Sequence, residues 1–292
     1  MRKVLKRISI NKDLLLRTFA SSLGWLFSSF SIFLAFFSFD DLGIQTLGHR
    51  FLIILGIVIL ACICAVVRIM SYSKRVILSE STRSITLRYG NLWSYAFSNK
   101  CHSKRIVIIS VNTTFDTIVD PAGIDKPLVS ENTIHGQWIN QMEKNGVDID
   151  EIDRQIDNSL KNQNIVPLSV LSKTRGKCNN YSKGTIAYLT FKDTVFYLLA
   201  LSEFDENNNT HNSIEELRTS IHKMIDYLDK NGQGLDVYMP LMGTGKSRTN
   251  GINDRMALEL IKSELLINKE KLHGNINVIV YEGDKDKISL GG

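Results

Sequence analysis

Only four cysteines occur in the 292 residues, and their positions match neither a disulfide framework nor a zinc site. Cys62 and Cys64 lie inside an apolar run, whereas Cys101 and Cys178 are far apart. The pair Cys101-His102 has the composition of a nucleophile beside its base. Residues adjacent in sequence are rarely placed for catalysis, however, so a loop cysteine beside a surface histidine is the simpler interpretation. The cysteine content fits a reducing compartment and predicts no metal site.

A basic stripe interleaved with aromatic residues, which is typical of nucleic-acid binding, is also missing. The net charge of +5 is unevenly distributed, because residues 1–75 hold ten Lys/Arg against three Asp/Glu, a net of +7, which leaves −2 for residues 76–292. The positive charge therefore belongs to the amino-terminal part of the chain. Nucleic acid is not expected as a partner.

The chain lacks the first glycine of a P-loop, although residues 235–248, LDVYMPLMGTGKSR, resemble one. The motif Gly245-Lys246-Ser247 would need a glycine five residues before Gly245, where Pro240 stands. The stretch still suits a phosphate, because a buried-strand pattern runs into glycines whose backbone N–H groups can converge on an anion. The alternative is an ordinary solvated turn. The expected ligand-binding residues here are Leu241, Gly243, Thr244, Gly245, Lys246, Ser247 and Arg248.

Two long uncharged apolar runs lie in the first 75 residues. Residues 18–39 would form a helix of roughly 33 Å, enough to cross a bilayer core of about 30 Å. Residues 51–67 form the second run, which continues past Arg68 to Met70. A cleaved signal peptide fits poorly, because the first run is too long and ends in Ser-Phe-Asp-Asp. Residues 1–75 are thus predicted to form a transmembrane hairpin with spans at about 18–39 and 51–70.

The charges that flank these runs predict the orientation of the hairpin. Six Lys/Arg residues precede the first span and three follow the second, whereas the connecting loop has Arg50 beside Asp40 and Asp41. This bias predicts a multi-pass protein of the inner membrane with both termini in the cytoplasm. Serines and a glycine in the first span are compatible with helix association in a homo-oligomer.

Residues 76–292 alternate between short β-rich runs and helical periodicities. This alternation predicts an α/β fold, with a mixed sheet covered by helices on both faces. Strands are expected at residues 76–78, 85–87, 106–111, 186–191, 195–201, 237–241 and 278–281. Helices are expected at residues 134–142, 149–160, 214–228 and 256–265, the third of them with Ser213 and Glu216 as a capping box.

A second group of polar residues follows the expected strand at 106–111. Asn112 can both donate and accept hydrogen bonds, which suits a ribose, and Asp116 can accept from a hydroxyl or an amine. The alternative is a turn that satisfies its own backbone. Further along, Gly136 would permit a close backbone approach, and His135 is either a ligand contact or a capping or core histidine. The candidates in these two segments are Asn112, Thr113, Thr114, Phe115, Asp116, His135 and Gly136.

These segments together resemble the macrodomain family, which binds ADP-ribose and related nucleotides. The resemblance covers roughly residues 76–285 and rests on Gly90-Asn91-Leu92, on the strand that ends at Asn112, and on residues 239–245. It implies that the position of Asn91, with Leu92 beside it, contacts adenine, that Asn112 contacts the distal ribose, and that residues 243–248 surround the phosphates. Asn91 replaces the usual aspartate, Phe115 stands where hydrolytic members often have asparagine, and the paired glutamates of glycohydrolases are absent. The resemblance therefore implies a binding protein without catalytic residues.

With two membrane spans before it, the domain order is similar to the membrane-anchored macro-type effectors of type II Thoeris anti-phage systems. That resemblance implies a ligand derived from ADP-ribose, expected to be histidine-ADP-ribose, and no other cofactor. A TIR-domain partner makes this signal, and the effector then compromises the lipid bilayer. A membrane-tethered ADP-ribosyl hydrolase is the alternative, for which Asp116 and His135 are the local candidates for the base.

Overall fold

The computed structural model describes residues 2–39, 41–98, 103–125, 127–203, 213–243 and 252–291. The described chain forms two compact units. Residues 75–282 form one of them, and the other combines the residues up to Lys74 with those from Gly283 onward.

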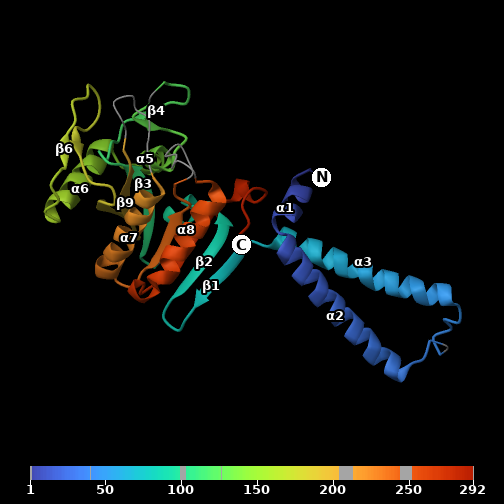
Figure 1. The fold of residues 1–292 in the computed structure, drawn as a ribbon. Coiled ribbons are helices and arrows are strands. Elements are labelled where there is room, and N and C mark those ends of the chain that lie inside the picture. Colours follow the sequence, from blue (N-terminus) through green and yellow to red (C-terminus); the bar gives the residue numbers. More distant parts are fainter. Residues whose placement is uncertain are drawn as a thin grey trace. The chain divides into compact units, whose positions relative to one another are not determined.

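The larger unit is built on a seven-stranded sheet with the order β1-β2-β11-β10-β3-β9-β8 (Figure 1). Five neighbouring strands, from β2 through β9, are parallel, and β8 pairs antiparallel with β9. The strands are β1 Lys74–Ser79, β2 Ser84–Gly90, β3 Arg105–Asn112, β8 Ile186–Phe191, β9 Thr194–Ser202, β10 Asp236–Pro240 and β11 Ile276–Tyr281. Each coincides with a predicted strand, so the mixed α/β sheet is confirmed.

Helices cover the sheet because the parallel strands are apolar on both faces. On one face, Val107 and Ile109 of β3 lie in a core with Trp138 of α5 and Ile152 of α6. In the other helix layer, α7 packs on β9 and on α8, and Figure 1 shows both helices in front of the strands. The helices are α4 Trp93–Ala96, α5 Ile134–Lys144, α6 Ile149–Asn162, α7 Ile214–Asn231 and α8 Asp254–Ile267. The capping box of Ser213 and Glu216 at the start of α7 is confirmed.

Two small two-stranded ribbons were not predicted. One pairs β4 Val119–Asp120 with β5 Val129–Ser130, and the other pairs β6 Ser169–Val170 with β7 Asn179–Asn180. Two-residue strands are too short to show an alternating pattern, which explains why the sequence did not indicate them.

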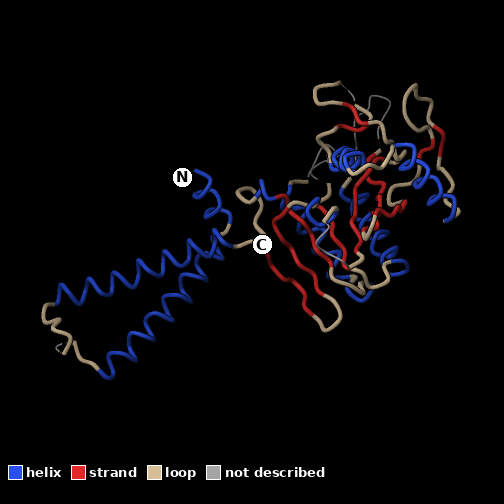
Figure 2. Tube along the Cα trace, turned by 180° about the vertical axis from the view of Figure 1, so that it is seen from behind, coloured by secondary structure: helices blue, strands red, loops and turns tan. Residues whose placement is uncertain are grey.

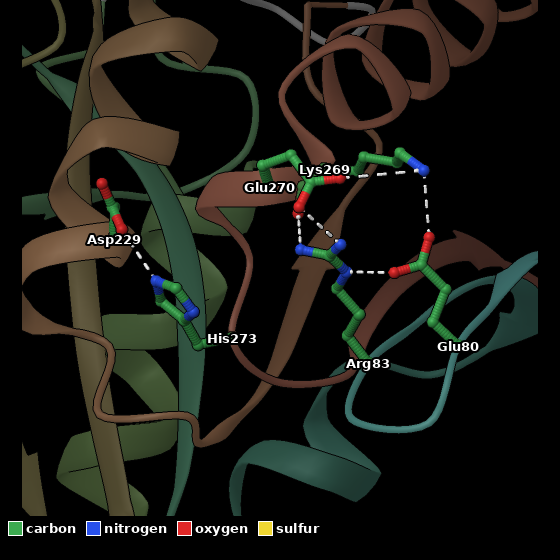
Figure 3. Close-up of polar contacts among 6 residues, drawn as sticks. All are labelled: Glu80, Arg83, Asp229, Lys269, Glu270 and His273. Carbon is green, nitrogen blue, oxygen red and sulfur yellow. Dashed lines mark hydrogen bonds and ion pairs between the residues drawn. The ribbon is translucent and has the colours of Figure 1, made fainter.

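A ring of charged side chains lies at the edge of the sheet where the parallel strands begin (Figure 3). Arg83, in the turn between β1 and β2, contacts Glu80 at 2.6 Å and Glu270 at 2.8 Å. Lys269 of the short helix η1 (Lys269–Lys271) closes the ring, with its Nζ 3.0 Å from Glu80 and 3.8 Å from Glu270. The hydrogen bonds from Lys269 and Arg83 lower the pKa of Glu80. This edge is therefore tied together by ion pairs, while the opposite edge carries the loops that follow the strands.

The smaller unit contains the two apolar helices. Helices α1 (Arg2–Ile10), α2 (Lys12–Phe36) and α3 (Leu47–Ser71) follow one another, and α2 and α3 are both long and apolar enough to cross a membrane. Figure 2 shows α2 and α3 as the two legs of a hairpin, converging at the end where α1 lies. Ala61, Ala65 and Ile69 form a buried stripe at a spacing of four on α3. These two helices are candidate membrane spans.

The carboxyl-terminal residues group with this helical unit. After β11 and the short helix η2 (Glu282–Asp284), Ile288 and Leu290 are buried, and Ser289 Oγ donates to Asn11 Oδ1 at 2.7 Å. Asn11 in turn donates to the carbonyl of Arg7, and Arg7 donates to the carbonyl of Tyr72. The chain therefore passes from the helical unit into the larger unit, and after β11 it returns to the helical unit.

Candidate functional site

The predicted ligand-binding residues other than His135 and Gly136 follow three strands that end at one edge of the sheet. Because β2, β11, β10 and β3 are parallel, Asn91, the loop from Leu241 and Asn112 all lie at the carboxyl ends of the strands. The strand order places the end of β10, which Leu241 follows, between Asn91 and Asn112. Three strand spacings of about 4.8 Å separate β2 from β3 by roughly 14 Å. The three strand ends therefore lie in a row with the end of β10 in the middle, and open α/β sheets place ligands at this edge.

The turn after β3 is held by its own hydrogen bonds. The Oδ1 of Asn112 accepts from the backbone N–H of Asp116 at 3.0 Å, and its Nδ2 donates to Asp116 Oδ2 at 2.9 Å. Thr114 Oγ1 donates to the same oxygen at 2.6 Å. Phe115 has a φ of 52°, and its buried ring packs edge-on against Tyr181. The self-satisfied turn, one of the two interpretations of this segment, is what the structure shows, and the ligand contacts of residues 112–116 stay predictions.

A segment that the sequence did not indicate covers this turn. It is the tip of the ribbon formed by β6 and β7, residues 171–178, which we call the strap. Lys173 Nζ lies 2.8 Å from Asp116 Oδ2, and the backbone N–H of Lys177 donates to Asp116 Oδ1 at 2.6 Å. Asp116 is fully buried and accepts from four donors, whereas the Lys173 side chain is 21% exposed. A buried carboxylate is stable only when it is paired in this way.

Further ion pairs hold the strap in place. Arg175 contacts the buried Asp120 at 2.7 Å, and Lys177 Nζ lies 2.8 Å from Asp153 of α6. Gly176 has a φ of 79°, and a Cβ at this position would overlap the carboxylate of Asp116. The alternating cations of Lys173-Thr-Arg-Gly-Lys177 are the one local signal for the strap. Their acidic partners lie more than fifteen residues away, so no short-range pattern connects them.

The start of α5 brings His135 and Gly136 toward the same turn. Thr133 caps the helix by accepting from the N–H of Gly136 at 3.0 Å. A Cβ at Gly136 would overlap the carbonyl oxygen of Ser130, so the backbone at this glycine lies close to that of Ser130, and its approach to a ligand stays a prediction. His135 is 6% exposed and stacks on Trp138, with ring centroids 6.3 Å apart.

Burial lowers the pKa of His135 to about 4; the negative charge of Asp116 opposes this shift, and the positive charge of Lys177 adds to it. His135 is therefore a neutral, buried histidine in the folded protein at neutral pH. As a base it would be neutral and ready to accept a proton, but its burial opposes the charged product.

This lowered pKa predicts that the protein is less stable in weak acid. The unfolded chain, whose histidine has a pKa of about 6.5, binds a proton as the pH falls through 6.5, whereas the folded chain takes it up only near pH 4. Between pH 7.5 and pH 5 this one group should reduce the free energy of unfolding by about 2 kcal/mol. Urea unfolding of wild type and His135→Phe at both pH values measures this change in the free energy of unfolding. The variant should lose less stability at pH 5 than wild type does. An equal loss in both proteins would contradict the assignment.

The other two strand ends are described in part. Asn91 is exposed, and its Oδ1 accepts from the backbone N–H of Trp93, while Leu92 is buried. Next to this turn, Tyr95 stacks on Tyr238 of β10 with centroids 4.7 Å apart. After β10, Leu241 donates its N–H to the carbonyl of Ile279, and Gly243 has a φ of 89°.

The predicted residues Thr244, Gly245, Lys246, Ser247 and Arg248 lie outside the described residues. Metal-binding groups of three or more His, Cys, Asp or Glu side chains are absent from the described ranges.

Comparison with known proteins identifies the family. The model of the family described as "Thoeris protein ThsA, Macro domain" matches residues 85–281, which include every strand of the sheet except β1 and every helix of the larger unit. The chain belongs to the ThsA Macro domain family. The ThsA match spans all three strand ends described above, and it starts after the two candidate membrane spans.

Individual relatives of this ThsA-type chain are more distant. The chain is 24% identical to the Thoeris protein ThsA of Bacillus amyloliquefaciens strain Y2 over 259 residues, which cover 87% of this chain and 81% of that protein. Among solved structures, a mutant macrodomain of Oceanobacillus iheyensis with ADPR aligns with a TM-score of 0.46 at 8% identity, covering 73% of this chain and 93% of that one. The Trypanosoma brucei macrodomain in complex with ADP-ribose aligns with a TM-score of 0.36 at 10% identity, covering 70% and 66%.

Proposed function

We propose that the larger unit binds an ADP-ribose-type nucleotide along the carboxyl edge of its sheet. The observation that carries the proposal is the strand order, because the end of β10, after which the glycine-rich segment follows in sequence, lies between the turns that follow β2 and β3. ADP-ribose is an elongated molecule with a diphosphate between two ribose groups and adenine at one end. A phosphate loop in the middle of a linear site, with polar turns on both sides, matches that order of groups. Membership of the ThsA Macro domain family supports the same ligand class.

The proposed role is that of a membrane-anchored receptor in anti-phage defence. The ligand is histidine-ADP-ribose made by a TIR-domain partner, and its binding to the cytoplasmic unit drives hairpins of several copies to rearrange and disrupt the membrane. Such a response requires the ligand to bind one assembly state more tightly than the other. The two candidate spans and the similarity to the Bacillus amyloliquefaciens protein support this role.

A receptor is favoured over an ADP-ribosyl hydrolase by the surroundings of Asp116. A general base must reach the proton that it removes, directly or through one water. Asp116 is fully buried, and both of its oxygens accept hydrogen bonds from the protein. Incubation of the full-length protein with ADP-ribosylated protein tests this choice. If the protein turns over these substrates and Asp116→Asn abolishes the turnover, the protein is an enzyme and not a receptor.

We expect ADP-ribose to raise the melting temperature of the full-length protein in detergent. Ligand that binds only the folded state at about a hundredfold above its dissociation constant adds roughly 2.7 kcal/mol of stability. The panel should contain ADP-ribose, histidine-ADP-ribose, NAD and ATP. Histidine-ADP-ribose is expected to give the largest shift at equal concentration. The proposal fails if none of the ADP-ribose compounds changes the melting temperature.

A matched pair of variants locates the binding site. Gly245→Glu places a carboxylate in the loop that is proposed to hold the diphosphate, so it should abolish the shift through charge repulsion. Thr82→Glu adds the same charge to the exposed turn between β1 and β2, at the opposite edge of the sheet, and should leave the shift unchanged. Equal shifts in both variants would place the ligand elsewhere.

A further inference from the structure

The hairpin contains a groove lined mostly by polar residues, which neither the proposed role of the larger unit nor the apolar character of the two candidate spans explains. The groove lies between α2 and α3 and has a volume of about 460 Å³. Its lining residues are Arg17, Thr18, Ser21, Ser22, Cys64 and Arg68. Two cationic side chains and three hydroxyl groups thus surround one opening, although both helices are otherwise strongly apolar.

Helix geometry explains why these residues meet. Arg17 and Ser21 lie four residues apart on α2, and Cys64 and Arg68 lie four apart on α3, so each pair occupies one face of its helix. Because the two helices run in opposite directions, the start of α2 lies beside the end of α3, and the hairpin is narrowest at that end (Figure 2). Both arginines therefore project at the same level of the hairpin.

The two guanidinium groups are available to a ligand. Neither Arg17 nor Arg68 makes a side-chain hydrogen bond or ion pair within the described part of the chain, and both residues are exposed. Asp13, one turn before Arg17, does not pair with it in the structure. Arg7 and Arg50 of the same unit, by contrast, donate to the backbone carbonyls of Tyr72 and Ile44.

The level of the groove identifies its ligand. Arg17 directly precedes the uncharged run of the first span, and Arg68 directly follows that of the second, so both lie where the hydrocarbon region meets the headgroups. Arginine pairs with phosphate through two parallel hydrogen bonds, and hydroxyl groups donate further bonds to phosphate oxygens. Basic pockets between membrane helices on the cytoplasmic side bind anionic headgroups. We propose that this groove binds the phosphodiester of an anionic phospholipid of the cytoplasmic leaflet.

The inference rests on the membrane hairpin of the proposed function, and it gives the hairpin a specific lipid requirement. General attraction between basic flanks and an anionic surface would depend on the number of charges and not on their place. A groove depends on Arg17 and Arg68 themselves. Substitutions of equal charge inside and outside the groove separate these two cases.

The test measures lipid binding by the full-length protein in neutral detergent. Phosphatidylglycerol and cardiolipin are titrated against phosphatidylcholine, with inorganic phosphate as a separate arm, and binding is followed by melting temperature and native mass spectrometry. The double variant Arg17→Gln/Arg68→Gln should bind anionic lipid at least tenfold more weakly. Lys3→Gln/Lys6→Gln, which removes two charges from α1, should stay within twofold of wild type. Equal losses in the two variants, or no preference over phosphatidylcholine, overturn the proposal. Inorganic phosphate binding as tightly as the lipid overturns it as well.

Alkylation of two cysteines supplies a second readout that does not depend on stability. Cys64 lines the groove, whereas Cys62 is also exposed but lies about 200° around α3. Bound anionic lipid should slow the reaction of N-ethylmaleimide with Cys64 and not with Cys62, as measured by mass spectrometry of the peptides. Equal rates at both cysteines with and without lipid contradict the groove.

Failure of this inference is distinguishable from failure of the proposed function. The groove variant should keep the ADP-ribose melting shift, because none of its substitutions lies in the larger unit. Resistance of the protein to carbonate extraction from membranes tests the hairpin itself. An inserted protein that binds ADP-ribose without lipid preference refutes the groove alone, whereas extraction by carbonate refutes the membrane anchor.

Discussion

Replacing Asp116 with alanine is expected to lower the free energy of unfolding by about 3–5 kcal/mol. The carboxylate is fully buried and accepts from Asn112, Thr114, Lys173 and the N–H of Lys177. Its removal leaves a mostly buried ammonium group without its counter-charge, and several donors lose the acceptor that they share, which is the costly way to break a buried ion pair. Urea unfolding followed by tryptophan fluorescence measures the change, since Trp138 is fully buried.

Two comparisons separate this mechanism from general damage to the turn. Adding Lys173→Met to Asp116→Ala removes the unpaired charge and should recover about 1–3 kcal/mol of the loss. Asp120→Ala is the matched single variant, because Asp120 is also buried but its partner Arg175 is 54% exposed and can return to water. Asp120→Ala should therefore lower the free energy of unfolding by about 2 kcal/mol less than Asp116→Ala does. Additive effects of Asp116→Ala and Lys173→Met would show that the pair does not stabilise the turn.

The sheet could be predicted from the sequence because its strands are nearly continuous apolar runs. In β3, residues 106–109 are all at most 1% exposed, so the hydrophobic run alone marks the strand. The same holds for α5, α6, α7 and α8, whose apolar residues recur at the helical period, whereas the four-residue α4 was not predicted. The two candidate spans were visible for a similar reason, since length and absence of charge are properties of a single segment.

The candidate site could be predicted only in outline. The polar residues after β2, β3 and β10 were identified because strand ends are local features, and the parallel sheet brings them to one edge. The internal bonding of Asn112 and Asp116 was one of two interpretations that composition could not separate. The strap was missed, because its contacts with Asp116 and Asp153 join residues that no periodicity relates.

The grouping of the carboxyl-terminal residues with the hairpin was also not visible in the sequence. Ile288 and Leu290 are two isolated apolar residues after the last strand, and nothing in their spacing indicates what they pack with. The hydrogen bond from Ser289 to Asn11 joins positions 278 residues apart. Such contacts depend on topology, which here returns the chain to its starting unit after β11.

Replacing Gly176 with alanine is expected to destabilise the protein by about 2–5 kcal/mol, through two separate effects. The first is backbone strain, because a φ of 79° belongs to the left-handed region, where an L-residue costs about 1–2 kcal/mol. The second is overlap, since the new Cβ would meet Asp116 Oδ1 and lie 3.0 Å from its Cγ and 3.2 Å from Leu128 Cδ1. Four hydrogen bonds hold that carboxylate in place, so the strap has to move instead.

Gly146→Ala separates the two effects. Gly146 has a φ of 83°, and a Cβ there would meet nothing within 4 Å, so this variant carries the strain without the overlap. It should lose only about 1–2 kcal/mol in urea unfolding. The difference between the two variants then measures how tightly the strap packs on the turn after β3. If that turn borders the nucleotide, Gly176→Ala should also change the ADP-ribose melting shift, while Gly146→Ala leaves it intact. Equal destabilisation by both substitutions would show that the strap yields at no cost and does not hold the turn in place.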